Sequence, residues 1–589
     1  MRRIVSLFSI LILGLTLTAL AQEFRATISG DVVDESGSPV EGAKVVVTNI
    51  EKNTTTETIT NSSGRYVVQF LPPGKYQVAV EKSGFKKFVR GEIVLSAADR
   101  IAIDVKLEVG AVTENTQVTA VTPLLQTETA SRTATIENRM LENIPTSGRN
   151  LYQLQYTLPG VIKNSTYWGS MELYAFGNVN NVSISGGRSG ENETLIDGVA
   201  NTHADRGVTL VPSLNSTQEF TIHTNTYDAQ FGRVGGGVTS ITLKSGTNAL
   251  HGQLFEFFKN EKLNANDWIA NKNNEARTKY WNNTFGFEVD GPVYIPKLFD
   301  GRNRAFFMIS LEGLRERQEQ PLVTSLPTAE MLRGDFSKLT DNAGNLITIY
   351  DPLTTRLNPN YDPSKQESLA NPRYIRDAFQ NNIIPPDRIN PIAAKAASFY
   401  PQPNRPSDDL DNLKNYAVFN PARNGYDAWL GKMDFHLAQD HQVSFRYGQT
   451  PWSNFAQIAW GTNAAEPSGE APSTRVSRNW GADWVYNISP SLVFNLRGGL
   501  ARFEAFSGNI FAGGFDPKEL GFSASLVSQF TALQFPRLEV GTPNQPYSPL
   551  GATRVSNYET HDTWSLQPNL SWNRGSHLRK MGFEFRLYN

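Results

Sequence analysis

The sequence predicts a mainly β protein that consists of an N-terminal β-sandwich, a mixed α/β segment and part of an antiparallel outer-membrane β-barrel. In the C-terminal half, stretches of about ten residues alternate apolar and polar side chains. The run 480–488, for example, puts tryptophan, alanine, tryptophan, tyrosine and isoleucine on one face. These stretches pair through short turns such as Ser489-Pro490-Ser491, and long polar connections such as 315–426 separate the pairs. Strands of about 9–11 residues with short turns at one end and long loops at the other are typical of an outer-membrane β-barrel.

The chain begins with a pattern that is typical of a secretory signal peptide, residues 1–21. Met1-Arg2-Arg3 is positively charged, and Ala19-Leu20-Ala21 is a small-x-small cleavage site. The apolar stretch 4–17 between them is shorter than the roughly 20 residues that a membrane helix needs, although a single anchoring helix is the alternative interpretation. Because no later stretch is long and apolar enough for a transmembrane helix, we expect an exported chain whose membrane spans consist of strands.

Composition narrows the class further. The formal net charge of −2 becomes −4 once Arg2 and Arg3 leave with the signal peptide, so no basic excess indicates a nucleic-acid partner. The absence of cysteine excludes disulfides, a lipid-anchoring cysteine, thiol catalysis and thiolate zinc sites. Several tryptophans lie on expected strands, most of them near a strand end, where interfacial aromatic girdles occur. They are Trp281, Trp429, Trp480, Trp484, Trp564 and Trp572.

Residues 22–110 are expected to form the β-sandwich, because short alternating stretches are separated by turn signals such as Ser36-Gly37-Ser38-Pro39. We expect its core to contain Val45, Val47, Tyr66, Val68, Tyr76, Val78, Ile101, Ile103 and Val105. The runs GDVVDESGSPVEGAKVVVTN and NSSGRYVVQFLPPGKYQVAVEKSGF resemble the carboxypeptidase-regulatory-like domain, an immunoglobulin-like module with a carbohydrate-binding-like fold. No histidine has a glutamate three residues later, so this sequence lacks the zinc peptidase that the module accompanies in metallocarboxypeptidases.

The linker 111–124 contains a candidate energy-coupling segment. The segment resembles the box at the start of TonB-dependent receptors and consists of Val112, Thr113, Glu114, Asn115, Thr116, Gln117, Val118 and Thr119. Such a box adds a strand to the sheet edge of a partner, which the resemblance identifies as the inner-membrane TonB complex. A plain linker strand is the alternative.

Residues 125–247 resemble the plug domain of TonB-dependent receptors. The resemblance rests on a glycine-arginine strand with Gly186, Gly187 and Arg188, on the turn Asp197-Gly198, and on a strand at 238–243 that leads into the barrel. From the residues alone, Asp197-Gly198 is most simply a hairpin turn and Arg188 a satisfied structural charge. The glycine cluster 232–237 is not a phosphate-binding loop, because no P-loop lysine follows it and no helix opens after it. We expect these glycines to allow tight packing inside the barrel.

Residues 248–589 are expected to form part of the barrel. We expect nine membrane strands, near 251–258, 281–291, 305–314, 428–437, 441–448, 478–488, 492–503, 563–572 and 577–588. The expected lipid face carries Met433, Phe435, Phe445, Trp480, Trp484, Tyr486, Phe583 and Phe585. The expected lumen face carries Lys432, Asp434, Arg446, Asp483, Arg497 and Glu584. The phrases SLPTAEMLRGDFS and FQNNIIPPDRINPIAAKAASFYPQPN in the longest loop resemble the Oar-like branch of TonB-dependent receptors.

These strands account for only part of such a barrel. The resemblance implies about 22 strands around a plug, and bacterial single-chain barrels have an even number of strands. Nine strands would leave unpaired backbone groups at an edge, so we expect an open, curled sheet with a free edge at His577–Tyr588. A smaller native barrel that assembles with other subunits is the alternative.

The resemblance implies an outer-membrane TonB-dependent receptor or transporter that moves a large or scarce substrate, with its N-terminal domain in the periplasm. The expected partners are the TonB complex, outer-membrane lipid and an unknown substrate, a carbohydrate or a protein. We expect no cofactor, no metal, no nucleic acid and no catalysis. One alternative is an outer-membrane adhesin or surface-structural protein that binds polysaccharide. Another is a secreted carbohydrate-processing enzyme, which would need two carboxylates about 5–10 Å apart.

Overall fold

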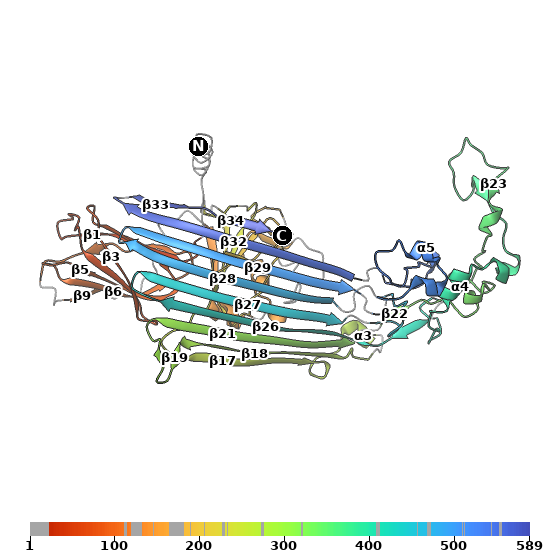
Figure 1. Cartoon of the computed structure of the whole chain (residues 1–589), viewed down its shortest axis with the longest axis horizontal. Coiled ribbons are helices and arrows are strands. Elements are labelled where there is room, and N and C mark those ends of the chain that lie inside the picture. The colour runs from red at the N-terminus through yellow and green to blue at the C-terminus, as the bar shows by residue number, and fades with distance from the viewer. Residues whose placement is uncertain are drawn as a thin grey trace.

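The computed structural model describes residues 23–110, 115–118, 132–144, 147–163, 182–188, 190–204, 207–225, 230–232, 234–272, 276–319, 322–407, 411, 413–455, 458–467, 473–508, 511, 513–542, 545–552, 556–575 and 577–589. The expected signal peptide, 1–21, lies outside these residues. Within them, no helix is both long enough and apolar enough to cross a membrane. The chain forms a sandwich, a plug and a large curved sheet, and its long connections extend beyond one end of that sheet (Figure 1).

The sandwich consists of two sheets that face each other across one core. One sheet is ordered β4-β1-β7, with β8 also on β1, and the other is ordered β3-β2-β5-β6-β9. The strands are β1 (Ala26–Val33), β2 (Lys44–Asn49), β3 (Thr54–Ile59), β4 (Arg65–Leu71), β5 (Gly74–Glu81), β6 (Lys87–Leu95), β7 (Arg100–Ala102), β8 (Val105–Lys106) and β9 (Asn115–Val118). The pairs β1–β7, β1–β8 and β6–β9 are parallel.

All nine residues predicted for the sandwich core are buried, each with an exposed fraction of 3 % or less. Burying a valine or isoleucine side chain fully contributes about 1.5–3 kcal/mol, so these alternating faces supply the main stabilisation of the domain. The hydroxyl of Tyr66 keeps a partner inside this core, because it donates to the carbonyl of Ile103 at 2.8 Å. The predicted sandwich and its register are therefore confirmed.

The plug is built around a mixed sheet ordered β10-β15-β16-β13-β14. Its strands are β10 (Arg132–Glu137), β13 (Glu193–Ile196), β14 (Val199–Ala200), β15 (Thr217–Asn225) and β16 (Val238–Leu243), with the separate pair β11 (Val161–Lys163) and β12 (Val182–Ile184). The helical elements are α2 (Asn138–Asn143), η1 (Ser147–Arg149) and η2 (Leu151–Thr157). The predicted mixed α/β architecture and the strand at 238–243 are both present.

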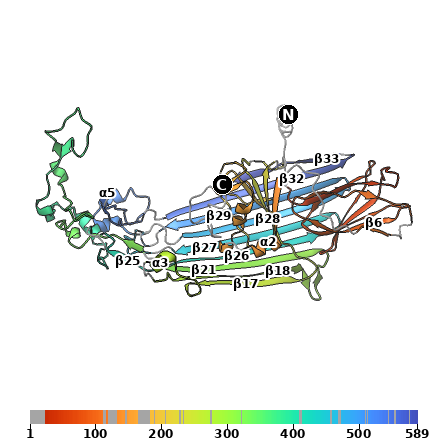
Figure 2. The ribbon, with the colours of Figure 1, turned by 180° about the vertical axis from the view of Figure 1, so that it is seen from behind.

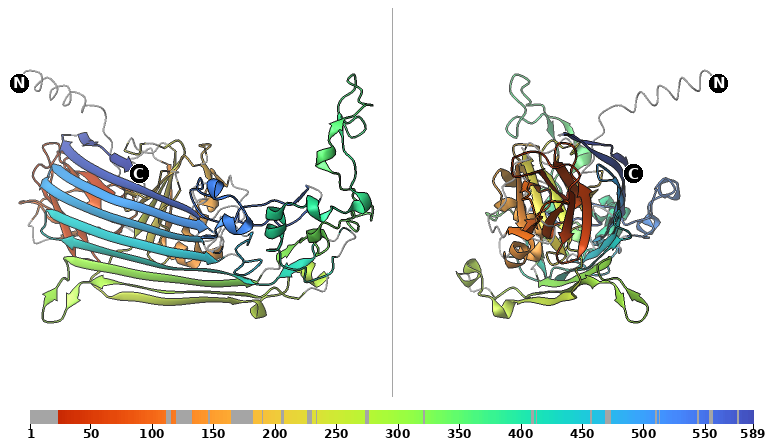
Figure 3. Two further views of the ribbon diagram at one scale, coloured as in Figure 1. Left: turned by 45° about the vertical axis from the view of Figure 1, so that its right-hand side comes forward. Right: turned by 90° about the vertical axis from the view of Figure 1, so that its left-hand side faces the viewer.

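The C-terminal part forms one antiparallel sheet in which consecutive long strands are neighbours. Its strands are β17 (His251–Asn260), β18 (Tyr280–Pro292), β21 (Ala305–Glu319), β26 (Pro421–His436), β27 (His441–Phe455), β28 (Ser473–Ser489), β29 (Leu492–Gly508), β32 (Ser556–Arg574), β33 (His577–Gly582) and β34 (Phe585–Tyr588). The last two both pair with β32, and no pairing between described residues joins them to β17. The sheet is therefore open, as predicted, and it curls around one side of the plug and the sandwich (Figure 3).

Every predicted barrel strand is present, but most are longer than predicted. β32 has 19 residues, and β28 and β29 have 17 each. The additional residues extend toward the long loops, where polar residues interrupt the alternation. Trp429, Trp480 and Trp564 consequently lie well inside their strands, so their predicted position near a strand end is wrong. The last predicted strand is also interrupted, between β33 and β34.

The two faces of this sheet follow the prediction. Met433, Phe445 and Phe585 are 40, 52 and 58 % exposed on the face that points away from the plug. Lys432 and Arg497, on the other face, are 8 and 0 % exposed. The plug lies against this second face (Figure 2). The alternation therefore separates an apolar outer face from a charged inner face that contacts the plug.

The connections at one end of the sheet are mostly short, and the sandwich lies at this end. The Thr58 hydroxyl donates to the carbonyl of Pro490 at 3.0 Å, and the Asn61 amide donates to the carbonyl of Gly575 at 2.8 Å. One connection here is longer than the others. Residues 293–304 form a hairpin from β19 (Tyr294–Ile295) and β20 (Phe299–Asp300) that the sequence did not indicate.

At the opposite end, the connections β21–β26, β27–β28 and β29–β32 pack together into one body, called the loop body below (Figure 1). Its core is formed by Leu326, Ala396, Tyr400, Ala459, Trp460, Ala465, Leu520, Phe535, Leu550 and Ala552. The elements of these connections are β22 (Leu322–Thr324), η4 (Met331–Arg333), η5 (Pro352–Thr354), β23 (Arg356–Leu357), β24 (Tyr374–Ile375), η6 (Gln380–Asn382), η7 (Pro386–Arg388), α4 (Pro391–Ala397), β25 (Tyr416–Val418), η8 (Pro517–Leu520), α5 (Ala524–Val527), β30 (Gly541–Thr542) and β31 (Gln545–Pro546). The remaining connection at this end, between β17 and β18, holds η3 (Glu261–Leu263) and α3 (Trp268–Lys272).

Candidate functional site at the plug–barrel interface

The turn Asp197-Gly198 joins β13 to β14 and points into the barrel sheet. Both residues have positive φ angles, 45° and 74°, which is the geometry of a two-residue hairpin turn that aspartate and glycine tolerate. Asp197 also ties the turn to the neighbouring strand β16, because its Oδ1 accepts the backbone N–H of Leu243 at 3.0 Å. The predicted hairpin turn is therefore confirmed, and its position gives it a second role that the sequence did not show.

The second role is to contact cationic side chains from three barrel strands. Asp197 Oδ2 lies 3.0 Å from Lys432 Nζ and 3.9 Å from Arg446 Nε. Arg446 also donates to the carbonyl of Ile196 at 2.8 Å. At Gly198, an added Cβ would lie 2.3 Å from the guanidinium of Arg497, so only glycine lets this cation approach the turn. The turn is thus enclosed by cations from β26, β27 and β29.

A second cluster joins the first described residues of the chain to the same sheet. Arg25 contacts both Glu23 at 2.7 Å and Asp483 at 2.9 Å. Arg497 contacts Asp483 at 2.7 Å and Glu23 at 3.3 Å. Burial alone would raise the pKa of the Glu23 carboxyl, but Arg25 and Arg497 outweigh it and lower this pKa to about 2. Glu23 therefore stays ionised and holds the two arginines together.

A third contact forms where Arg149 of the plug meets Glu312 of β21. Arg149 Nε lies 3.4 Å from Glu312 Oε2, and Glu312 is fully buried. The hydroxyl of Tyr426 donates to the other carboxylate oxygen at 2.9 Å, so both oxygens of Glu312 have partners. The guanidinium of Arg149 also lies over the ring of Phe257 on β17, 4.5 Å from its centroid. Arg149 follows Gly148 in the motif Gly148-Arg149-Asn150.

Two further ion pairs attach the plug to the two sides of the sheet. Glu193 of β13 lies 2.7 Å from Arg586 of β34. At the other side, Lys244, the residue that follows β16, lies 3.5 Å from Glu288 of β18. Breaking a buried pair leaves an uncompensated charge and typically costs about 3–5 kcal/mol. The ion pairs therefore fix the position of the plug in the sheet, and the charges can be rehydrated only if water enters between the two bodies.

The sandwich contacts the plug through Glu219 of β15. The carboxylate of Glu219 accepts the backbone N–H of Ala97, next to the sandwich strand β6. Burial, opposed by the hydrogen bond from Ala97 and assisted by the nearby carboxylates Asp99 and Glu137, raises the pKa of Glu219 to about 7. This contact between the sandwich and the plug is therefore sensitive to pH near neutrality.

The other predicted plug residues occupy a turn. Ser185 and Gly186 have φ angles of 52° and 82°, which end β12 at Ile184, so the expected glycine-arginine strand is wrong at these positions. Gly187 packs on the glycine cluster as expected, because an added Cβ would lie 2.4 Å from the Cα of Gly236. Arg188 is exposed and forms no ion pair with another described residue, so the structure does not place it as a satisfied buried charge.

The candidate energy-coupling segment is described only in part. Val112, Thr113, Glu114 and Thr119 lie outside the described residues, whereas Asn115, Thr116, Gln117 and Val118 form β9. This strand pairs in parallel with the edge strand β6 of the sandwich, with Val89 opposite Gln117. In the described part of the chain, no three acidic or histidine side chains are placed to hold a metal ion.

Comparison with known proteins agrees with this architecture. The family described as outer membrane beta barrel domain matches residues 242–589, and the carboxypeptidase regulatory-like domain matches residues 27–108. The first match covers more than half of the chain, so the chain belongs to this outer-membrane β-barrel family and lies in the outer membrane. Because short turns mark the periplasmic end of such barrels, the sandwich lies on the periplasmic side and the loop body on the extracellular side.

Individual proteins are similar to parts of this chain. The TonB-dependent transporter Oar of Myxococcus xanthus is 29 % identical over 254 residues, which are 41 % of this chain and 22 % of that protein. The outer membrane transporter YddB of Escherichia coli has a TM-score of 0.43 at 11 % identity, covering 77 % of this chain and 48 % of that one. The siderophore receptor PirA of Acinetobacter baumannii has a TM-score of 0.39 at 11 % identity, covering 77 % and 47 %. These relatives are transporters and receptors rather than enzymes, and the matched region spans half or less of each.

Proposed function

We propose that the chain acts as a TonB-dependent receptor that moves a large or scarce substrate across the outer membrane. The supporting observation is a plug that lies on the inner face of the barrel sheet. It is attached there through buried ion pairs, such as Asp197 with Lys432, and through an apolar cluster that includes Leu210 of the plug and Leu430 of the sheet. An attachment of this kind is strong while it is dry and weakens once water enters. A pulling force on the segment before the plug would supply the energy to separate the charges.

The segment that would receive this force is Val112–Thr119. Its described part already behaves as an added strand, because β9 extends the sandwich sheet at the free edge of β6. A TonB partner would bind the same segment by the same β-augmentation. We infer that the partner pairs with the edge of β9 that β6 occupies, so release from β6 is expected to precede or accompany capture by the partner.

The first test replaces Val112–Thr119 by a glycine-serine segment of equal length. Outer membranes that hold the full chain are incubated with the periplasmic domain of TonB, and the bound TonB domain is measured. We expect the unaltered chain to bind the TonB domain and the chain with the replaced segment to bind at least tenfold less of it. Equal binding by both chains would contradict the assignment of the segment.

The second test locks β9 on the sandwich. Because the chain contains no cysteine, the double variant Val89→Cys/Gln117→Cys holds the only two thiols, at positions that are opposite each other in the β6–β9 register. Oxidation should link them and suppress TonB binding, and reduction should restore it. Each single variant is the control and should bind TonB in both redox states. Full TonB binding by the oxidised double variant would show that β9 need not leave β6.

An adhesin is the second candidate function, and the loop body favours it. The described residues of three long connections share one apolar core outside the membrane, which gives the extracellular end a surface of its own. An adhesin needs no energy coupling, so the replacement of Val112–Thr119 separates the two functions. Surface binding that persists without this segment, in cells that take up nothing, would identify an adhesin.

A further inference from the structure

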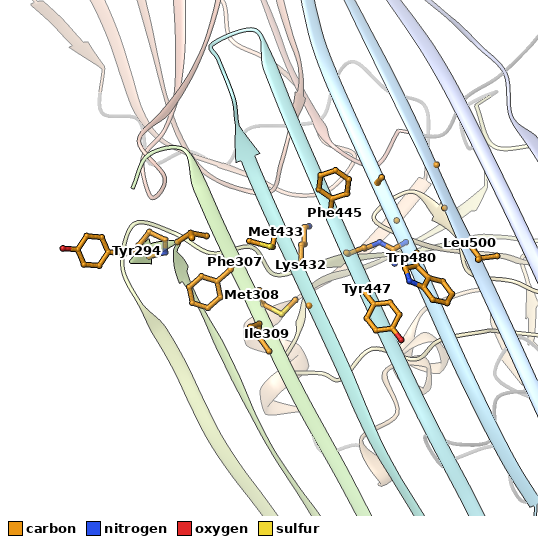
Figure 4. A pocket seen from close by; sticks show the side chains of 18 of the residues that line it. Tyr294, Phe307, Met308, Ile309, Lys432, Met433, Phe445, Tyr447, Trp480 and Leu500 are labelled. Atoms are coloured by element: carbon orange, nitrogen blue, oxygen red, sulfur yellow. The ribbon is translucent and has the colours of Figure 1, made fainter. Parts of the chain in front are cut away.

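We propose that the outer face of the sheet carries a binding site for one glycerophospholipid of the periplasmic leaflet. The site is a groove of about 1450 Å³ between the hairpin β19–β20 and the outer face of β21, β26, β27, β28, β29 and β32 (Figure 4). This volume exceeds the roughly 300–1,000 Å³ that encloses a drug-sized ligand. The proposal rests on the outer-membrane location of the chain and not on its transport function.

The floor of the groove is formed by small residues on the outer face. Gly431, Ala482 and Gly498 line it, and Ala482 is paired across the strands with Phe445 on one side and Gly498 on the other. A Cβ added at Gly498 would meet its nearest atoms at 3.4 and 3.5 Å, which is ordinary van der Waals contact, so a side chain can be accommodated at this position. A flat, small-residue floor lets an acyl chain lie against the backbone of the sheet.

Large apolar side chains form the walls. Phe445 is 52 % exposed, Ile309 is 45 % exposed and Trp564 is 47 % exposed, and all three line the groove. The close-up view shows Met433, Phe445, Tyr447, Trp480 and Leu500 along the strands, with Tyr294 apart from them on the hairpin (Figure 4). These side chains give the groove an apolar lining, which suits a hydrocarbon chain.

The hairpin supplies a cationic edge. Residues 293–304 contain Lys297, Arg302 and Arg304 against one carboxylate, Asp300, so the segment has an excess of two positive charges. Arg302 lines the groove and is paired with Asp300, and both side chains are about half exposed. Its guanidinium lies 5.3 Å from the ring centroid of Tyr294. Asp300 accepts from Nε and Nη2 of Arg302, so the Nη1 side of the guanidinium is the side that can donate to a phosphate of a lipid headgroup.

The position of the hairpin fixes which leaflet supplies the lipid. The hairpin joins β18 to β21 at the same end of the sheet as the short turns, which is the periplasmic end. Arginine beside tyrosine is typical of the membrane–water interface, where an aromatic ring lies among headgroups and a cation reaches phosphate. The headgroup is therefore placed at Arg302 and the acyl chain over Ala482 and Gly498, toward the middle of the membrane.

The test uses the delipidated full chain in detergent and native mass spectrometry with two added probes. One probe is palmitoyl-oleoyl phosphatidylglycerol, and the other is monoolein, which has an acyl chain but no phosphate. We expect one phosphatidylglycerol to be retained in clear preference to monoolein. Ala482→Phe fills the groove and should weaken phosphatidylglycerol binding at least tenfold. Arg302→Gln should reduce the preference for phosphatidylglycerol over monoolein severalfold while leaving monoolein binding unchanged.

The matched control is Val476→Phe. Val476 lies on the same outer face of the same strand, six residues from Ala482, but does not line the groove, so its enlargement should leave lipid binding unchanged. Gly498→Leu fills the groove from the neighbouring strand and carries the test if Ala482→Phe fails to assemble. Unchanged binding in the groove-filling variants would overturn the site. Equal retention of both probes by the unaltered chain would overturn the headgroup assignment.

Discussion

Charged residues contribute to holding the plug in place, and Asp197 is one of them. It is the anion between Lys432 and Arg446, which are 8 and 5 % exposed. Asp197→Asn would remove the carboxylate that these two buried cations share, so we expect docking of the plug to weaken by about 3–5 kcal/mol. The rate at which a protease cleaves the plug of the membrane-embedded chain measures this loss.

The matched control is Asp427→Asn on the barrel strand β26. Asp427 pairs with Arg315 at 2.9 Å, but both side chains are more than 40 % exposed. An exposed pair contributes roughly 0–1 kcal/mol, so protease sensitivity of the plug should barely change. Equal effects of the two substitutions would contradict the assignment of the turn as a buried anchor.

Glu219 gives the contact between sandwich and plug its pH dependence. Its pKa in the folded chain, about 7, exceeds the ordinary value of 4.5, so the folded state binds the proton more tightly. The resulting stabilisation is complete below about pH 4.5 and is lost as the pH rises through 7. Between pH 6 and 8 we expect the contact to lose about 1 kcal/mol. Hydrogen exchange near Ala97 measures it, with Glu219→Gln as the pH-insensitive comparison, and identical pH dependence in both chains would refute this prediction.

Among the elements, β27 illustrates the two faces of the sheet in adjacent residues. Phe445 is 52 % exposed on the lipid face, and a charge there costs about 2–4 kcal/mol near the middle of the membrane. Phe445→Arg should therefore reduce the amount of chain that assembles in the membrane. Arg446→Phe should assemble but loosen the plug, because Asp197 and the carbonyl of Ile196 lose a partner. Membrane fractionation and plug proteolysis distinguish the two effects, and the reverse pattern would mean that the faces are exchanged.

The elements also show what sequence alone can predict. Alternation with a period of two identified all the barrel strands and nine residues of the sandwich core, because one face of each strand contacts an apolar environment. It missed the outer parts of strands such as β32, where neither face does. It also missed the loop body, because residues such as Leu326 and Phe535 pack from irregular segments that have no periodicity.

The site was harder to predict because its pairs are distant in sequence. Arg149 and Glu312 are 163 residues apart, and Glu23 and Arg497 are 474 apart. The sequence identified the Asp197-Gly198 turn from local turn chemistry but had no means of naming its cationic partners. Inward-facing charges such as Glu312 and Lys432 on otherwise apolar strands were the available signal. They indicate a lumen face, but not which plug residue they meet.

At the scale of the whole molecule, the sandwich, the plug and the loop body are arranged along the membrane sheet. The sandwich lies at the periplasmic end and holds β9 at its edge. The plug lies on the inner face of the sheet, and the loop body lies at the extracellular end (Figure 2). We propose that the plug leaves its ion pairs with the sheet when Val112–Thr119 is pulled.

The most direct measurement of this claim is thiol labelling of Ser213→Cys in living cells. Ser213 belongs to the plug, is 5 % exposed and lies 3.3 Å from Ser310 of β21, and the chain has no other thiol. The exposed Ser525→Cys in the loop body controls for delivery of the reagent. We expect rapid labelling at position 213 in energised cells. We expect slow labelling after treatment with an uncoupler or after replacement of 112–119. Labelling of that position at one constant rate under all three conditions would contradict this claim.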